Sequence, residues 1–119
     1  MIAVIFEVTP HKAHYDEYLA IAADLKPILE GIDGFISIER FQSMTTPGKV
    51  LSLSFWRDED AVKAWRNVAE HRAAQVEGRN RIFADYRLRV AAVIRDYGMT
   101  PRDQVPDDSS AHHDIGPQS

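Results

Sequence analysis

Two residues in the middle of the chain could carry out proton chemistry beside an aromatic ring. Trp65 and His71 lie six residues apart, shortly after the acidic run Asp58–Asp60. Imidazole has an ordinary pKa that suits a general base near neutral pH. A phenol must lose a proton before its electron-rich ring can pass an electron to dioxygen. We therefore interpret His71 as a candidate catalytic base and Trp65 as a candidate wall of the substrate pocket.

Both residues also have a structural interpretation. Trp65 belongs to the apolar stripe of its predicted helix, where a core tryptophan is common. On that helix, at ~100° per residue, His71 would lie about 120° around the axis from Trp65, so it is not simply another core position. It could instead be a solvated histidine at a helix break. The sequence leaves these alternatives open.

The pattern of apolar residues predicts the elements that must position these two side chains. Residues 2–8, 35–41, 50–56 and 86–97 are rich in β-branched and aromatic residues and read as strands. From His14 to about residue 30, apolar residues recur three and four apart, as in an amphipathic helix. Asp58 is suited to cap a second helix. The order β-α-β-β-α-β predicts a ferredoxin-like α+β fold with a four-stranded antiparallel sheet.

Three local signals refine this prediction. Pro27 predicts a kink or a fresh first turn within the first helix. The turn residues Thr46–Lys49 predict a hairpin between the second and third strands. The second helix is expected either to break near Asn67 or to continue to Val76.

The two faces of the predicted sheet differ in character. Alternation assigns one set to a helix-facing core: Ile2, Val4, Phe6, Val8, Ile36, Ile38, Leu51, Leu53, Phe55, Tyr86, Leu88, Val90, Ala92 and Ile94. The other set is mixed: Ile5, Phe35, Phe41, Val50, Trp56 and Val93 beside Glu7, Glu39, Ser52, Ser54, Arg87 and Arg89. A solvated sheet rarely carries so many large apolar residues, and a sealed core does not hold so many charges.

A second copy of the chain satisfies both constraints. We therefore predict a symmetric homodimer, sheet against sheet, with a partly polar chamber between the sheets or between sheet and helices. The residues expected to line the substrate pocket are Glu7, Glu39, Phe41, Ser52, Ser54, Trp56 and Arg89.

The charged members of this pocket have two interpretations. Burial could raise the pKa of Glu7 or Glu39 enough for either to assist as a base. Paired with Arg87 or Arg89, either would instead be a structural carboxylate, which we favour. Arg89 could also hold an anionic oxygen of a substrate or intermediate.

Composition limits the class of protein. The 119 residues predict one domain over residues 1–98, followed by a disordered tail over residues 99–119. There is no cysteine, so disulfides and thiolate chemistry are excluded. A net charge of −4 gives no basic field for nucleic acid, and no apolar run is long enough for a membrane helix. The paired histidines His112 and His113 lack metal-site spacing, so no metal is expected, and cytoplasm is the expected location.

From Met1 to about Gly98 the chain resembles the antibiotic biosynthesis monooxygenase domain family, of the dimeric α+β barrel superfamily. The resemblance rests on Gly34-Phe35, on the run Leu53–Glu59, on Ala64-Trp65 followed by His71, and on the closing residues Arg95–Gly98. It implies the dimeric fold expected above. It also implies one of several activities, since the family includes enzymes that oxidise polycyclic phenols to quinones with dioxygen and no metal or flavin, quinol monooxygenases and haem-degrading monooxygenases.

The haem-degrading branch implies an Asn on the first strand, a Trp on the second helix and a His ligand further along. Glu7 stands where the Asn is expected, while Trp65 matches the Trp. His71 follows Trp65 more closely than in that branch, where the matching position is Gln75 here. Two of the three features therefore differ.

Three hypotheses follow. The first is a cofactor-independent monooxygenase that oxidises a small aromatic or quinol-like substrate with dioxygen, with His71 as base and Trp65 holding the ring. The second is a haem-binding or haem-degrading monooxygenase. The third is a non-catalytic dimeric module that binds a ligand.

Overall fold

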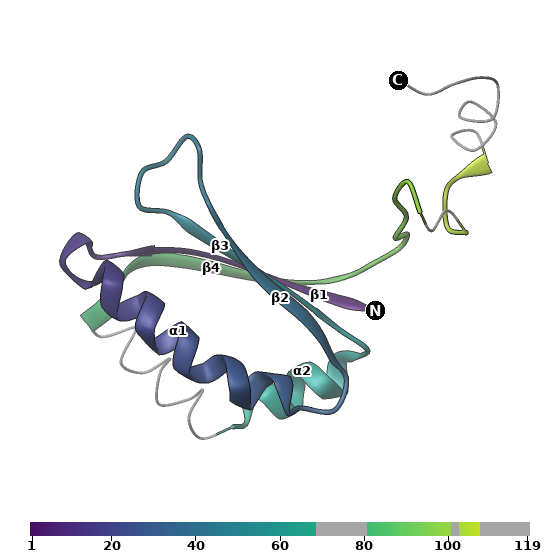
Figure 1. Cartoon of the computed structure of the whole chain (residues 1–119), viewed down its shortest axis with the longest axis horizontal. Coiled ribbons are helices and arrows are strands. Elements are labelled where there is room, and N and C mark those ends of the chain that lie inside the picture. Colours follow the sequence, from purple (N-terminus) through teal and green to yellow (C-terminus); the bar gives the residue numbers. More distant parts are fainter. Residues whose placement is uncertain (69–80, 101–102, 108–119) are drawn as a thin grey trace.

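The chain folds into one four-stranded antiparallel sheet with two helices on the same side (Figure 1). The computed structural model describes residues 1–68, 81–100 and 103–107. Its elements are β1 (Ile2–Pro10), a short 3-10 helix η1 (Lys12–His14), α1 (Tyr15–Glu30), β2 (Phe35–Gln42), β3 (Val50–Trp56), α2 (Glu59–Arg66) and β4 (Phe83–Ala92). The strand order β2-β3-β1-β4 confirms the predicted ferredoxin-like fold.

Most element boundaries follow the predictions, with two differences. Helix α1 is one uninterrupted helix that contains Pro27, so no fresh first turn begins there. Strand β4 runs from Phe83 to Ala92, earlier than the predicted 86–97. The expected core position of Ile94 is therefore wrong, because this residue lies beyond β4 and is 83% exposed. Its end is fixed by its neighbour: Ala92 pairs with Ile2, and Val93 N–H donates to the carbonyl of Met1, after which β1 offers no further partner. Helix α2 ends at Arg66, with Asn67 as its C-cap.

Two apolar clusters fill the space between the helices and the sheet. The first contains Val8, Tyr18, Val50 and Ile82. The second contains Leu29, Trp56, Ala61 and Val62, with Trp65 packed against it. Because members of both clusters come from α1, the helix holds the sheet along much of its length.

The expected side assignment of β3 is wrong. Residues directly opposite in an antiparallel pair share a face, and β1 places Ile2 opposite Trp56, Val4 opposite Ser54 and Phe6 opposite Ser52. The helix-facing side of β3 therefore carries Val50, Ser52, Ser54 and Trp56, whereas Leu51, Leu53 and Phe55 lie on the other side. Trp56 is 1% exposed, so burial of its indole decides the register in spite of the two serines.

A bulge in β2 also changes which side chains of that strand face the helices. The register shifts between Phe35 and Ser37, so Phe35 lies opposite Trp56 and Ile38 lies opposite Ser54. Phe35 and Ile38 therefore both pack into the helix-facing core, while Ile36 is 52% exposed. The expected assignment of Phe35 to the far face and of Ile36 to the core is wrong for this reason.

The described residues contain no helix that is long and apolar enough to cross a membrane.

Candidate functional site

The N-terminus of α2 is anchored by a set of polar contacts that fix the position of Trp65. The carboxylate of Asp58 accepts a hydrogen bond from the backbone N–H of Ala61 at 2.9 Å, which confirms Asp58 as the N-cap. The Arg57 guanidinium donates to Asp58 at 2.9 Å and to Asp33 at 3.1 Å, and it lowers the pKa of both carboxyl groups. The helix therefore starts at a fixed point beside the turn that precedes β2.

Trp65 lies on the face of α2 that packs against the sheet. It is half-buried and contacts the cluster of Leu29, Trp56, Ala61 and Val62. A half-buried ring that packs on the core is compatible with both the structural and the pocket-wall interpretation. His71, the candidate base, lies outside the described residues.

Ser52, Ser54 and Trp56 lie on the helix-facing side of the sheet. The indole N–H of Trp56 donates to the Ser54 hydroxyl at 2.9 Å, and its ring meets Phe35 edge-on with centroids 5.3 Å apart. Both serines are buried, at 8% and 6% exposure. The buried N–H of Trp56 therefore has a hydrogen-bond acceptor in Ser54. This pair belongs to the core on which Trp65 packs.

Arg40 is a functional candidate that the sequence reasoning missed. It lies opposite Ser52, so it shares the helix-facing side with Phe6 and Leu88. Its neighbour on α1 is Tyr18, a buried phenol. Burial raises the pKa of Tyr18, and the Arg40 guanidinium offsets part of that rise. A signal was available: Arg40 is two residues from Ile38, so strand alternation places a charge where a core residue is expected.

A second α1–β2 contact lies one turn away from the first. The side-chain amide of Gln42 donates to the Tyr15 hydroxyl at 3.0 Å. Tyr15 and Tyr18 are three residues apart on α1, and Arg40 and Gln42 are two apart on β2, so two phenols meet two polar side chains in matching register. Helix α1 is therefore tied to the edge strand by polar as well as apolar contacts.

A pocket of about 280 Å³ lies between α2 and β4. It is lined by Glu59, Asp60, Val62, Lys63, Arg66 and Val90. The apolar side chains of β4 on this side remain accessible, with Leu88 46% and Val90 41% exposed. This end of the helix-facing side therefore offers apolar surface beside a charged helix.

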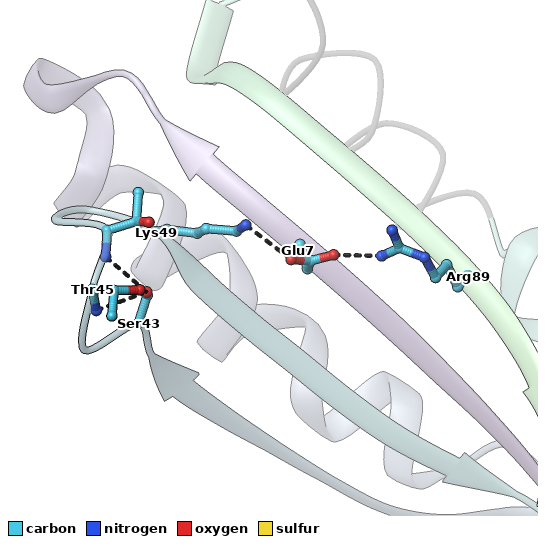
Figure 2. A network of polar contacts seen from close by, with 6 residues as sticks. Glu7, Ser43, Thr45, Lys49 and Arg89 are labelled. Carbon is cyan, nitrogen blue, oxygen red and sulfur yellow. Dashed lines mark hydrogen bonds and ion pairs between the residues drawn. The ribbon is translucent and has the colours of Figure 1, made fainter.

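Glu7 and Arg89 lie on the opposite side of the sheet, which we call the open face. It is defined by Ile5, Glu7, Glu39, Phe41, Leu51, Leu53, Phe55, Arg87 and Arg89. The Glu7 carboxylate lies between Lys49 Nζ, at 2.9 Å, and Arg89 Nη1 (Figure 2). Hydrogen bonding from Lys49, and then from Arg89, lowers the pKa of Glu7. The ion-paired interpretation of Glu7 is thus the one that the structure supports.

Glu39 and Phe41 complete the predicted pocket set on the open face. Phe41 is 42% exposed and Glu39 is also exposed. Leu51, Leu53 and Phe55 are half-buried next to them. The open face is therefore an apolar strip crossed by the charged row of Lys49, Glu7 and Arg89.

The sheet separates the predicted pocket residues into two groups. Trp65, Ser52, Ser54 and Trp56 lie on the helix-facing side, and Glu7, Glu39, Phe41 and Arg89 lie on the open face. One chamber of a single chain cannot contain both groups. Across residues 1–68, 81–100 and 103–107, no cluster of three or more His, Asp or Glu side chains could hold a metal ion.

This separation also bears on haem. Glu7, at the position where the haem-degrading branch implies an Asn, faces away from the helices, whereas Trp65 packs against the helix-facing core. The two side chains therefore do not converge on one ligand. The described residues do not fit the haem-degrading arrangement.

Comparison with known proteins agrees with this fold and extends it. The family description "Antibiotic biosynthesis monooxygenase" matches residues 1–77. The chain is 50% identical over 93 residues to the jasmonate monooxygenase ABM of Pyricularia oryzae, covering 78% of this chain and 43% of that protein. It is 36% identical over 62 residues to the uncharacterised protein YqjZ of Bacillus subtilis, covering 52% of this chain and 53% of that protein. The chain thus spans about half the length of the curated relatives it matches.

Among solved structures, SnoaB of Streptomyces nogalater, described as a cofactor-independent oxygenase, superposes with a TM-score of 0.69. The superposition covers 80% of this chain and 94% of that chain at 13% sequence identity, which supports the shared fold. The family match covers more than half of the chain and includes the strand-to-helix join that carries Trp65. The chain belongs to the antibiotic biosynthesis monooxygenase family.

Proposed function

We propose that this chain is a monooxygenase that inserts one atom of dioxygen into a small ring-containing molecule without metal, flavin or haem. The observation that carries the proposal is the 50% identity, over 78% of the chain, to a protein named as a jasmonate monooxygenase. The likeness to SnoaB supports independence from a cofactor. The substrate class is a ring that can lose a proton to a base, either from the O–H of a phenol or from a C–H bond next to a ketone, which covers both quinol-like molecules and a cyclopentanone such as jasmonate.

The proposed reaction balances without an external reductant. A base removes a proton from the O–H of a quinol-like ring, or from a ring CH₂ group next to a ketone, and the resulting anion passes an electron to dioxygen. Recombination forms a carbon–oxygen bond, and the peroxide then loses water to leave a carbonyl. One oxygen atom enters the product and the other leaves as water, and all four electrons come from the substrate ring.

Two residues have proposed roles in this sequence. His71 is the base, because neutral imidazole can accept the proton near pH 7. Trp65 is a wall of the pocket, since its ring packs against the apolar cluster and is only half-buried there. Ser54 and Trp56 act indirectly by holding the core on which α2 rests.

Oxygen uptake tests the proposal. We expect the wild-type protein to consume dioxygen with at least one member of a panel of anthrones, hydroquinones and jasmonic acid, with one dioxygen used per product. His71→Ala should lower kcat about 10²–10⁴-fold, the usual contribution of a general base. The matched control His11→Ala changes an exposed histidine next to η1 and should leave turnover unchanged.

Each contrary outcome has a defined meaning. Equal turnover by wild type and His71→Ala removes the base from the mechanism. An absence of turnover across the panel favours a ligand-binding module without catalysis. A Soret shift on titration with hemin would restore the haem hypothesis in spite of the separation of Glu7 and Trp65.

We further propose that the active form is a homodimer joined through the open face. Phe41 is 42% exposed on that face, beside the half-buried Leu51, Leu53 and Phe55. A face of this apolar character is stabilised when a second copy removes it from water. Sedimentation equilibrium should give twice the chain mass, and Leu53→Glu should give a monomer. The control Ala23→Glu, at an exposed position of α1 away from the open face, should remain dimeric. A monomeric wild type at working concentration contradicts this proposal.

A further inference from the structure

The charges on the open face are divided between the two edges of the sheet. One row across this face consists of Glu39 on β2, Leu53 on β3, Ile5 on β1 and Arg89 on β4. In the same strand order, the next row consists of Phe41, Leu51, Glu7 and Arg87. Asp85 lies beyond the two arginines on β4, opposite Thr9. The edge strand β2 thus carries an exposed carboxylate, and the edge strand β4 carries two exposed guanidinium groups.

Glu39 is too far from the arginines of its own chain to pair with them across the sheet. With strands about 4.8 Å apart, three strand spacings separate Glu39 from Arg89 by about 14 Å. Arg89 instead points toward Glu7, which also pairs with Lys49 (Figure 2). This row of two cations and one carboxylate has an excess of positive charge. Its burial under a second copy of the chain is therefore costly unless a further carboxylate balances it.

From this layout we infer that β2 of one copy lies over β4 of the other in the proposed homodimer, so that Glu39 pairs with Arg89 of the partner subunit. The inference rests on the proposed homodimer and specifies how its two copies are oriented. A two-fold axis that runs parallel to the strands, midway between the sheets, places β2 over β4 and β3 over β1. The contact then occurs twice, once at each edge.

This orientation balances the buried charges. The Arg89 guanidinium has five N–H donors in a planar fork, so it can hold Glu7 and the partner's Glu39 at the same time. Each contact then contains two cations, Lys49 and Arg89, and two carboxylates. The second copy of the chain thus supplies the negative charge that the row requires for burial.

Other side chains of the face are also complementary in this orientation. Leu53 lies over the partner's Ile5, so apolar surface meets apolar surface. Phe41 lies over the partner's Arg87, where a guanidinium can stack on the phenyl ring. The third row across this side of the sheet consists of Ser37, Phe55, Ala3 and Ala91. Phe55 therefore lies over the partner's Ala3, a large side chain against a small one.

The alternative two-fold arrangement of the same two faces is unfavourable. An axis that runs across the strands places β2 over β2 and β4 over β4. It gathers Arg87 and Arg89 of both copies at one edge and brings Glu39 of both copies together at the other. Like charges brought together at an interface repel each other. The charges of the open face therefore favour the axis parallel to the strands.

Cross-linking measures the orientation directly, because the chain contains no cysteine. Ser37→Cys and Ala91→Cys place single thiols on β2 and β4 without a change of charge. The two full-length variants carry different affinity tags, are refolded together and are treated with a bis-maleimide that spans about 10 Å, the usual separation of packed sheets. We expect a cross-linked dimer that contains both variants, and none from either variant alone. Ser37→Cys that cross-links to itself, or no cross-link in any sample, overturns the inference.

Charge reversal tests the cause of this orientation. Glu39→Arg should raise the dimer dissociation constant, measured by sedimentation equilibrium, about tenfold or more, because both symmetric contacts become repulsive. Asp24→Arg makes the same change of charge at an exposed position of α1 and should leave the constant unchanged. If Glu39→Arg fails to fold by circular dichroism, Glu39→Gln should raise the constant by a smaller factor. An unchanged constant in the Glu39 variant overturns the inference, because it is the result expected for like charges facing each other.

These outcomes separate the orientation from the dimer and from the reaction. A wild type that sediments as a monomer overturns both the proposed homodimer and the pairing of Glu39. A wild-type dimer that cross-links through Ser37→Cys alone preserves the homodimer and removes only the proposed orientation. Neither measurement uses turnover, so failure of the oxygen-uptake assay does not alter their interpretation.

Discussion

The indole N–H of Trp56 donates to the hydroxyl of Ser54, two residues earlier on the same strand and inside the core, at 2.9 Å. Trp56 is 1% exposed, so its N–H has no access to solvent. We predict that Ser54→Ala lowers the free energy of unfolding by about 1–3 kcal/mol, because it leaves a buried donor unsatisfied. Urea denaturation measures the change.

Ser37→Ala serves as the control for Ser54→Ala. Ser37 is exposed on β2, and its replacement should change stability by less than about 0.5 kcal/mol. Equal effects of the two substitutions would mean that the Trp56–Ser54 hydrogen bond contributes nothing beyond the intrinsic cost of the change in side chain.

The same pair shows why the fold could be predicted while the faces of β3 could not. Alternation locates the strand between Val50 and Trp56, and both predicted ends agree with the structure. Alternation alone does not say which of two apolar sets is buried. Leu51, Leu53 and Phe55 are the more apolar choice, yet one tryptophan whose N–H is satisfied by Ser54 outweighs them.

Gly34, directly before β2, lies so close to α2 that only glycine fits there. Its φ is +93°, and a Cβ there would lie 2.7 Å from the Cβ of Ala61. Gly48, in the β2–β3 hairpin, also has a positive φ of +79°, but a Cβ there would meet nothing within 4 Å. A substitution at Gly48 therefore reports the cost of backbone conformation alone, whereas the same substitution at Gly34 adds the cost of steric overlap.

We predict that Gly34→Ala destabilises the protein by about 1–3 kcal/mol more than Gly48→Ala, since overpacking adds to the shared backbone cost. Thermal unfolding of both variants measures the difference. Adding Ala61→Gly to Gly34→Ala should recover part of the loss, less about 1 kcal/mol for glycine in a helix. A double variant no more stable than Gly34→Ala alone would show that the overlap is relieved by other movement.

Asp58 has two roles that substitution can separate. It caps α2 through the N–H of Ala61 and it pairs with Arg57. Asp58→Ala removes both and should cost about 0.5–2 kcal/mol. Asp58→Asn keeps a capping oxygen and should cost less than about 1 kcal/mol, because the ion pair is exposed. Far-UV circular dichroism during denaturation measures both, and equal losses would assign the effect to the ion pair.

The candidate site was predictable only in part, because the sequence of a strand does not show which of its two sets of side chains faces the helices. The join after β3 could be located from the aromatic and acidic residues, and Asp58 and Trp65 are where the pattern placed them. Arg40 was missed because a charge in a strand is ordinarily assigned to solvent. Its spacing from Ile38 was a signal in the sequence, and the cross-strand register, with Ser52 opposite, places its side chain on the side that faces α1.

Glu7 gives the protein a pH dependence whose sign follows from its contacts. Lys49 and Arg89 lower its pKa from the ordinary value of 4.5 in the folded state. The unfolded chain therefore takes up a proton at higher pH than the folded chain does. The stabilisation is fully present above the unfolded pKa and is lost as pH falls through the folded pKa.

We therefore predict that wild type exceeds Glu7→Gln in unfolding free energy at pH 7, and that the difference shrinks as pH falls below 4.5. Urea denaturation from pH 7 to pH 3 measures it. Glu39→Gln removes a carboxylate from the same face without breaking an ion pair to any described residue of its own chain, so it reports the general effect of charge. High salt should reduce the Glu7 difference, because the row is accessible to screening ions. A difference that persists unchanged at pH 3 would show that the stabilisation by Glu7 does not depend on the negative charge of its side chain.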